Sequence, residues 1–225
     1  MRSYRYLDLI TAAFVAVLII CNVAAAKVVV LGPFAFDGGT LLFPLAYIFG
    51  DVLTEVYGYR RSRRVIWSGF FLLALASLTF SLVAALPALD QAEVKPFAQA
   101  FDKLFSLVPR IVLGSLLAYW AGEFSNSYVL AKMKLASKGR YFGLRAVSST
   151  LVGEAVDTSV FLLVAFFGVY PAAVLWLMFA SNYVFKVGVE VVFLPLTTAV
   201  AIWLKRAEGE DYYDVGTNFN PFKIR

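Results

Sequence analysis

The sequence predicts an all-α integral membrane protein with six transmembrane helices, both termini in the cytoplasm and a polar central cavity. Hydrophobic residues make up 61% of the 225 residues and charged residues 16%, whereas soluble domains contain about 45–50% and about 25%. Apolar runs of about 20 residues, the length of a membrane crossing, follow one another along the chain. Basic residues gather between alternate runs, which is the pattern that orients membrane proteins.

Each apolar run is assigned to one crossing by its length. The final run is too long to cross upright, and Pro195 offers a kink within it. The transmembrane domain is therefore expected over residues 1–207. The runs lie at residues 8–30, 39–57, 65–86, 108–130 and 146–169, and the sixth lies within residues 172–204.

Two polar segments lie outside these runs. Residues 86–103 form the largest loop on the outer side, with prolines and mixed charges, and we expect an interfacial helix or a short lid there. Residues 208–225 form a polar cytoplasmic tail with four aromatic residues, more than a disordered tail usually contains. We therefore expect this tail to dock on the cytoplasmic face.

The basic residues give the orientation. Fifteen of the 20 lie before the first run, between runs two and three, between runs four and five, or after the sixth, and only three lie in the other connections. The positive-inside rule places the fifteen in the cytoplasm, and with them both termini. Because topology explains these charges, they do not indicate binding to nucleic acid.

Several kinds of chemistry are excluded by composition. The chain contains no His, and its one cysteine is Cys21 in the first apolar run. A His/Cys zinc site and a Ser-His or Cys-His catalytic pair therefore cannot form. The phosphate-binding G-x-x-x-x-G-K-[ST] motif is missing as well. We expect a protein that is not an enzyme and that has no cofactor or bound metal.

Ionisable side chains inside the predicted runs are the main functional signal, because each costs at least about 2.5–3.5 kcal/mol to insert. They follow helical spacing, so each stripe must face the bundle interior. The second run carries Phe43, Tyr47, Asp51 and Glu55 at intervals of four, and the others carry Glu123 with Asn126, Glu154 with Asp157, and Asn182, Lys186 and Glu190.

Some of these groups have simple alternative explanations. Lys186 and Glu190 can form an i, i+4 salt bridge, and Asn126 can join two helices by a hydrogen bond. Glu55 can pair with Arg60 or Arg63 at the membrane surface. Pairing does not explain the whole set, because six carboxylates face two lysines within the runs. The surplus carboxylates can carry protons, bind a cation or accept hydrogen bonds from a substrate rich in N–H groups.

The second run also carries a family resemblance. Residues 43–58, Phe-Pro-Leu-Ala-Tyr-Ile-Phe-Gly-Asp-Val-Leu-Thr-Glu-Val-Tyr-Gly, resemble the signature of the queuosine precursor transporters, and residues 122–126, 148–158 and 217–222 fit the same family. The resemblance implies import of 7-cyano-7-deazaguanine and 7-aminomethyl-7-deazaguanine across the bacterial inner membrane. Such a carrier works by alternating access between the two sides.

Depth and spacing then suggest roles for the stripe residues. Carboxylates can accept both N–H groups on the guanine-like edge of such a base, amides can bind its carbonyl edge, and aromatic rings can stack on it. We expect substrate binding by Glu123, Glu154, Asp157, Asn126, Asn182, Phe43, Tyr47 and Asp51, and coupling or gating by Lys186, Glu190 and Glu55.

Two other functions stay open at this point. The chain can be the substrate-binding subunit of an energy-coupling-factor importer, with Ala12 and Ala16 giving a close-packing surface for the ATPase module. It can also be an intramembrane enzyme in which Asp51 and Glu55 hold Mg²⁺ and residues 60–64 take a lipid phosphate. The coupling ion is open, and a homodimer is our default expectation for so small a carrier.

Overall fold

The computed structural model describes residues 4–24, 27–31, 34–37, 39, 42–105, 109–168 and 171–223. Most of this part of the chain is helical, and one two-stranded hairpin accompanies the helices. In chain order the elements are α1 (Leu7–Ala24), β1 (Val28–Leu31), β2 (Phe34–Asp37), α2 (Phe43–Val52), the π-helix η2 (Leu53–Tyr57), α3 (Tyr59–Ala85), α4 (Lys95–Phe105), α5 (Pro109–Ala136), α6 (Phe142–Phe166) and α7 (Ala172–Glu208).

Four helices are long and apolar enough to cross a membrane, namely α1, α3, α6 and the Leu175–Glu208 part of α7. Helix α5 has 28 residues, which is also sufficient length, but it carries charged residues in its middle and last turns. The second predicted run is different, because α2 and η2 together reach only about 22 Å at 1.5 Å per residue, short of a hydrocarbon core of about 30 Å. Six full crossings therefore stay a prediction.

The structure corrects the first two runs. The first helix ends at Ala24, and residues 28–31 form a strand that pairs antiparallel with residues 34–37, so the chain is not purely α. Consecutive β-branched residues at 28–30 favour the extended conformation, which explains the change. Helix α2 begins at Phe43 with Pro44 in its first turn, a position where proline is tolerated. It then widens into η2, and π-helical turns are rare and are frequent at functional sites.

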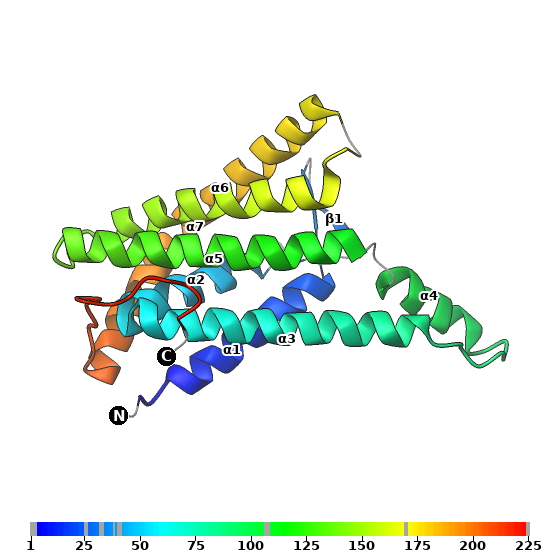
Figure 1. Ribbon diagram of the computed structural model, residues 1–225, viewed down its shortest axis with the longest axis horizontal. Coiled ribbons are helices and arrows are strands. Elements are labelled where there is room, and N and C mark those ends of the chain that lie inside the picture. The colour runs from blue at the N-terminus through cyan, green and yellow to red at the C-terminus, as the bar shows by residue number, and fades with distance from the viewer. Residues whose placement is uncertain are drawn as a thin grey trace.

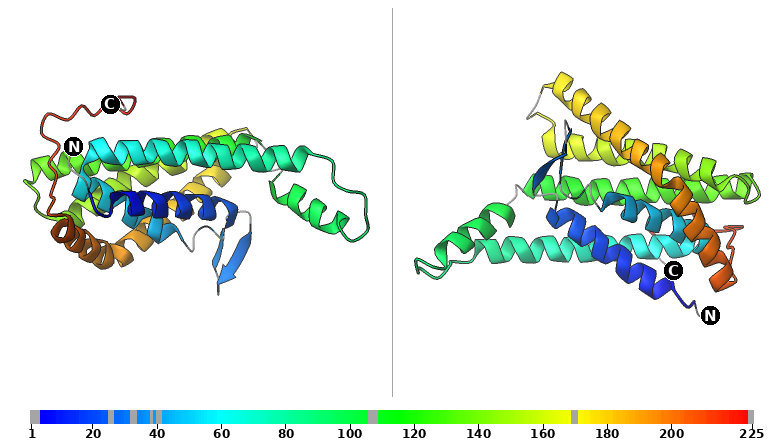
Figure 2. Two further views of the ribbon diagram at one scale, coloured as in Figure 1. Left: turned by 90° about the horizontal axis from the view of Figure 1, so that it is seen from below. Right: turned by 180° about the vertical axis from the view of Figure 1, so that it is seen from behind.

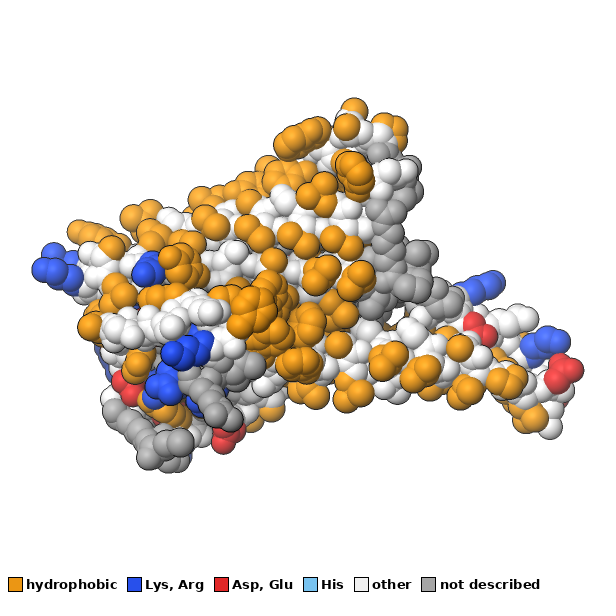
Figure 3. All heavy atoms as spheres, in the orientation of Figure 1, with side chains coloured by type: hydrophobic (Ala, Val, Ile, Leu, Met, Phe, Trp, Pro, Cys, Tyr) orange, Lys and Arg blue, Asp and Glu red, His pale blue; other side chains and the backbone are white. Residues whose placement is uncertain are grey.

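The helices form a bundle whose two ends differ. Helices α3, α5 and α6 run alongside one another, and α7 crosses them obliquely (Figures 1 and 2). Both ends of the chain, η2 and the α5–α6 turn lie at one end, whereas the hairpin, α4 and the start of α7 lie at the other. Hydrophobic side chains cover the middle of the face in Figure 3, and basic side chains gather at the end that holds the termini. This distribution suits a bundle surrounded by lipid.

The C-terminal tail packs on this basic end, beside α3. The Arg63 guanidinium donates to the backbone carbonyls of Asn218 at 2.7 Å and Asn220 at 2.6 Å. The indole nitrogen of Trp67 donates to the carbonyl of Pro221 at 2.8 Å. Arg63 is buried at 1% exposure, so the tail supplies the acceptors that this charge requires. The docking predicted from the aromatic residues is therefore seen.

Replacing Arg63 by Ala should release the tail. Two charge-assisted hydrogen bonds would be lost, and bonds of this kind contribute about 1.5–3 kcal/mol each. We expect faster hydrogen–deuterium exchange and earlier proteolytic cleavage in residues 211–223, with a lower melting temperature. Arg206→Ala is the control, because Arg206 is an exposed cation on α7. Equal exchange in both variants would show that Arg63 does not hold the tail.

Candidate functional site

A polar cavity of about 280 Å³ lies between α1, α2, α5, α6 and α7. This is close to the lower end of ligand pockets, which are about 300–1,000 Å³. Five residues predicted from helical spacing line it together, namely Glu123, Asn126, Asp157, Asn182 and Lys186. Because they come from three helices that are distant in sequence, the bundle itself assembles the cavity.

Small residues let the helices around the cavity approach closely. A Cβ added at Gly153 would lie 2.8 Å from the Cβ of Asn126, and one added at Gly122 would lie 2.8 Å from the Cβ of Asp157. Across α2, a Cβ at Gly50 would meet Glu123 Oε2 at 3.1 Å. Glycine thus places α5 against α6 and α2, as small residues do in membrane helix pairs.

Gly153→Ala should therefore disturb the bundle. The added methyl group must displace Asn126 or push α6 from α5, and overpacking of this kind costs about 1–3 kcal/mol. We expect a lower melting temperature and weaker ligand binding. Gly188→Ala on α7 is the matched control, since a Cβ there meets nothing within 4 Å among the described residues. Unchanged stability in Gly153→Ala would contradict close packing at this point.

Lys186 lies at one side of the cavity and forms ion pairs across to α6. Its Nζ is 2.8 Å from Glu154 Oε2 and 2.7 Å from Asp157 Oδ2. Glu154 is fully buried, whereas Asp157 is partly exposed to the cavity. The i, i+4 spacing of Lys186 and Glu190 on α7 had suggested a salt bridge between them. The structure instead directs Lys186 to α6, and it gives Glu190 another neighbour.

That neighbour is Asp51 on α2. Asp51 is fully buried and Glu190 is 3% exposed, and their carboxyl groups interact across the contact between α2 and α7. Asn126 donates from Nδ2 to Asp51 Oδ1 at 3.0 Å. Among the described residues, Asp51 Oδ2, Glu190 Oε1 and Asn126 Oδ1 have no hydrogen-bond partner. Asp51 is therefore linked to the cavity by its hydrogen bond with Asn126, which lines the cavity.

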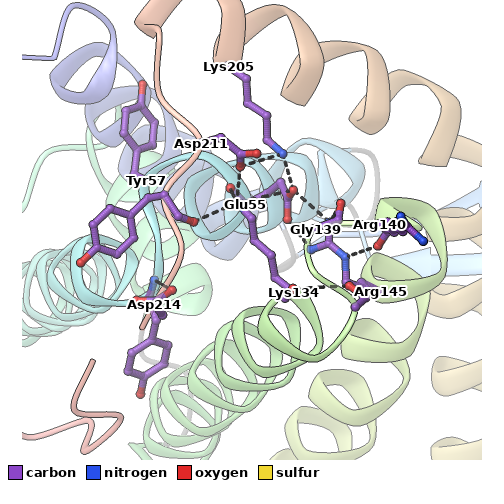
Figure 4. Close-up of polar contacts among 12 residues, drawn as sticks. Glu55, Tyr57, Lys134, Gly139, Arg140, Arg145, Lys205, Asp211 and Asp214 are labelled. Carbon is purple, nitrogen blue, oxygen red and sulfur yellow. Dashed lines mark hydrogen bonds and ion pairs between the residues drawn. The ribbon is translucent and has the colours of Figure 1, made fainter. Parts of the chain in front are cut away.

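Glu55 lies apart from the cavity, in a charged cluster at the basic end (Figure 4). Its carboxylate accepts hydrogen bonds from Arg145 Nη1 at 2.5 Å, Arg145 Nη2 at 3.0 Å and Lys205 Nζ at 2.5 Å. Lys134 Nζ is 3.7 Å from Glu55 Oε1 and also donates to the Glu55 backbone carbonyl. The predicted pairing with Arg60 or Arg63 is therefore wrong, because η2 points Glu55 inward toward α5, α6 and α7.

The tail completes this cluster through Asp211. Lys134 Nζ lies 2.5 Å and Lys205 Nζ 3.0 Å from Asp211 Oδ1. Burial alone would raise the pKa of Asp211, but hydrogen bonds from both lysines outweigh it and hold the pKa below the usual 3.8. The Glu55 cluster, defined as Glu55, Lys134, Arg145, Lys205 and Asp211, thus joins η2, α5, α6, α7 and the tail at one end of the bundle.

The predicted site is only partly reproduced in the described structure. Asp51 and Glu154 lie just behind the cavity, and the side chains of Phe43 and Tyr47 lie outside the described part, although both residues belong to α2. No group of potential metal ligands occurs among the described residues. Several other residues that line the cavity were not predicted: Cys21, Asn22, Ser115, Tyr119, Thr158 and Phe161. All except Phe161 could have been found from the sequence, because they are uncharged polar residues within apolar runs.

Apolar helices around a cavity with acidic side chains define the class, a multi-pass membrane protein. A family model described as "Putative vitamin uptake transporter" matches residues 37–200, and the chain belongs to this family. It is 32% identical to the "Probable queuosine precursor transporter" of Bacillus subtilis (strain 168), over 79% of this chain and 77% of that protein. It is 28% identical to the "Queuosine precursor transporter" of Escherichia coli (strain K12), over 70% and 69%. No solved structure matches.

Proposed function

We propose that this protein imports the queuosine precursors 7-cyano-7-deazaguanine and 7-aminomethyl-7-deazaguanine across the bacterial inner membrane. The observation that carries the proposal is the cavity of about 280 Å³ lined by Glu123, Asn126 and Asp157, in a chain with two relatives that are named for queuosine precursors. Its size suits a single small heterocycle, and its acidic lining suits a base with several N–H donors and a cationic aminomethyl form.

The free acceptors suggest how a base would sit. Glu123 Oε2 is buried without a hydrogen-bond partner among the described residues, so it can accept the ring N–H or exocyclic amine of a guanine-like edge. Asn126 donates one amide hydrogen to Asp51, and its Oδ1 is available as a further acceptor. Asn182 lines the cavity from α7 and donates to the Met178 carbonyl at 3.0 Å, and it can still donate to a base carbonyl.

The direction of access follows from the position of the cavity along the helices. Its lining residues on α1 lie near the end of that helix, away from the N-terminus, and those on α5 lie in the first two thirds. With the basic end in the cytoplasm, the cavity lies on the outer side of the Glu55 cluster. We propose that the cluster closes the cytoplasmic side in this conformation. Alternating access would then require the cluster to open.

Cys21 offers a direct test of orientation and access, because the chain has no other cysteine and this one lines the cavity. A membrane-impermeant maleimide should label it from the outside of cells, and a bound base should slow the labelling. Inside-out vesicles should label slowly, since the Glu55 cluster lies between Cys21 and the cytoplasm. Fast labelling from the cytoplasmic side alone would contradict the proposed orientation.

Binding itself is tested by thermal stability of the detergent-purified protein with each deazaguanine, guanine and adenine. A ligand at 100 times its Kd stabilises the native state by about 2.7 kcal/mol. Glu123→Gln and Asp157→Asn should abolish the shift caused by the deazaguanines. Glu93→Gln, an exposed carboxylate outside the bundle, should keep it. The absence of any shift in the unmodified protein would overturn the proposed substrate.

One observation favours the alternative of an ATPase-coupled importer. Ala12 and Ala16 are both exposed on α1, so this small-residue face is available to a partner helix, whether from a second copy or from an ATPase module. Proteoliposomes that contain only this chain distinguish the two modes, since an energy-coupling-factor subunit would not transport alone. Replacing both alanines by Trp should abolish module binding under that alternative and leave autonomous transport intact.

The Mg²⁺-dependent enzyme alternative depended on Asp51 and Glu55 acting together. Glu55 is already paired with three cations, and Asp51 interacts with Asn126 and Glu190 instead. Nothing in this arrangement favours that reaction.

A further inference from the structure

The interior of the bundle holds more carboxyl groups than cations. Five carboxyl groups lie along the described spanning segments near the cavity, and Lys186 is the single described cation among them. Lys186 is already shared by Glu154 and Asp157. The Glu55 cluster has its own cations at the basic end and cannot neutralise this surplus. The remaining carboxyl groups are Asp51, Glu123 and Glu190.

Asp51 and Glu190 meet the conditions for a pair that shares a proton. Both are more than nine-tenths buried, and each carries an oxygen without a donor among the described residues. Two adjacent carboxylates cannot both stay ionised in a buried site without a cation. A single proton between them removes one charge and supplies the missing donor.

The pair is connected to both functional regions of the molecule. Asn126 lines the cavity and donates to Asp51, so a base that binds Asn126 Oδ1 would fix this amide in its donating orientation. Asp51 also lies one helical turn before Glu55, in the last turn of α2 just before η2 begins. A change of charge at Asp51 would therefore act on the segment that carries Glu55 into its cluster.

We propose that the Asp51–Glu190 pair is the proton-binding site that couples uptake of the base to the proton gradient. This inference rests on the proposed transport function. One proton from outside water binds the pair together with the base, and the same proton leaves to cytoplasmic water when the Glu55 cluster opens. No bond other than O–H is formed or broken, and one proton enters with each base, in addition to any charge that the base itself carries.

Other groups near the pair can titrate, and the test must separate them. Glu123 of α5 and Glu154 of α6 act electrostatically on Asp51 and Glu190, Lys186 lies one turn away on α7, and Cys21 of α1 lines the cavity. Asp211 does not contribute at neutral pH, because the two lysines keep its pKa below 3.8. A comparison of Asp51→Asn/Glu190→Gln with the unmodified chain isolates the pair.

The test uses the full chain in proteoliposomes with trapped pyranine and radiolabelled 7-aminomethyl-7-deazaguanine and 7-cyano-7-deazaguanine. An inward proton gradient at clamped membrane potential should accelerate uptake at least about 5-fold, and addition of base should acidify the lumen. Asp51→Asn/Glu190→Gln should lose both responses. Glu190→Gln alone, which leaves the hydrogen bond from Asn126 to Asp51 in place, should lose them as well and keep the thermal shift caused by the base. Glu93→Gln should behave like the unmodified chain.

Three results would overturn the inference. An uptake rate that does not change with the proton gradient, or that rises with a sodium gradient instead, refutes proton coupling while leaving base transport established. Base binding that is absent altogether refutes the proposed function, and the pair can then still be tested without ligand. The unmodified protein should lose thermal stability as the pH rises above about 4.5, because the carboxyl groups of the unfolded chain have then lost their protons whereas the folded pair still holds one. An equal slope in the double variant would show that no proton is held by the pair.

Discussion

Replacing Glu55 by Gln is expected to lower the free energy of unfolding by about 3–5 kcal/mol, the cost of breaking a buried ion pair on one side. Glu55 is fully buried, and its carboxylate faces the side chains of Arg145, Lys205 and Lys134. Gln would leave Arg145, which is 1% exposed, without its anion. Thermal unfolding in detergent measures the loss, and the tail should also become more accessible, because Asp211 shares two of these cations.

A double-mutant cycle separates the ion pair from general disruption. Arg145→Gln alone should also destabilise the protein, whereas Glu55→Gln/Arg145→Gln should cost less than the sum of the two single changes. Glu93→Gln provides the control for loss of an exposed carboxylate. Additive effects in the cycle would contradict a direct Glu55–Arg145 interaction. In inside-out vesicles, a weakened Glu55 cluster should speed maleimide labelling of Cys21 from the cytoplasmic side.

Helical periodicity predicted five of the residues that line the cavity, but it could not predict the Glu55 cluster. Glu123, Asn126 and Asp157 face the interior because their neighbours are apolar and their spacing places them on one side of each helix. Glu55 has the same spacing from Asp51, but the widening at η2 turns it to another place. Its partners lie 90 and 150 residues away, so only the packing of α5, α6 and α7 brings them together.

The ends of the helices were predicted less well where local preferences competed with hydropathy. Residues 28–31 are as apolar as α1, yet their β-branched side chains favour the hairpin. Hydropathy also assigned the basic residues to loops, and it gave no indication that Lys134, Arg145 and Lys205 are structural. Lys134 and Arg145 are buried at 2% and 1% exposure, because their charges are satisfied by Glu55 and Asp211. A count of charges predicts an orientation and cannot identify such partners.

Lys186→Met is expected to have the second large effect, and its consequences differ from those of Glu55→Gln. Glu154 is fully buried and Asp157 is half-buried, and removal of their shared cation should cost about 3–5 kcal/mol at neutral pH. The cavity would also gain negative charge at its wall. Thermal unfolding and base binding measure the two consequences, and Lys186→Arg should preserve stability because it keeps the charge.

The two acids offer a way to restore Lys186→Met. Lowering the pH should recover stability in this variant, because protonation of Glu154 and Asp157 removes the unpaired charges and the folded state then binds more protons than the unfolded chain. Lys186→Met/Glu154→Gln/Asp157→Asn should be stable at all pH values near neutrality and should not bind the base. If Lys186→Met is as stable as Lys186→Arg at neutral pH, the ion pairs of Lys186 do not support the fold. Loss of binding without loss of stability would instead assign Lys186 to the substrate.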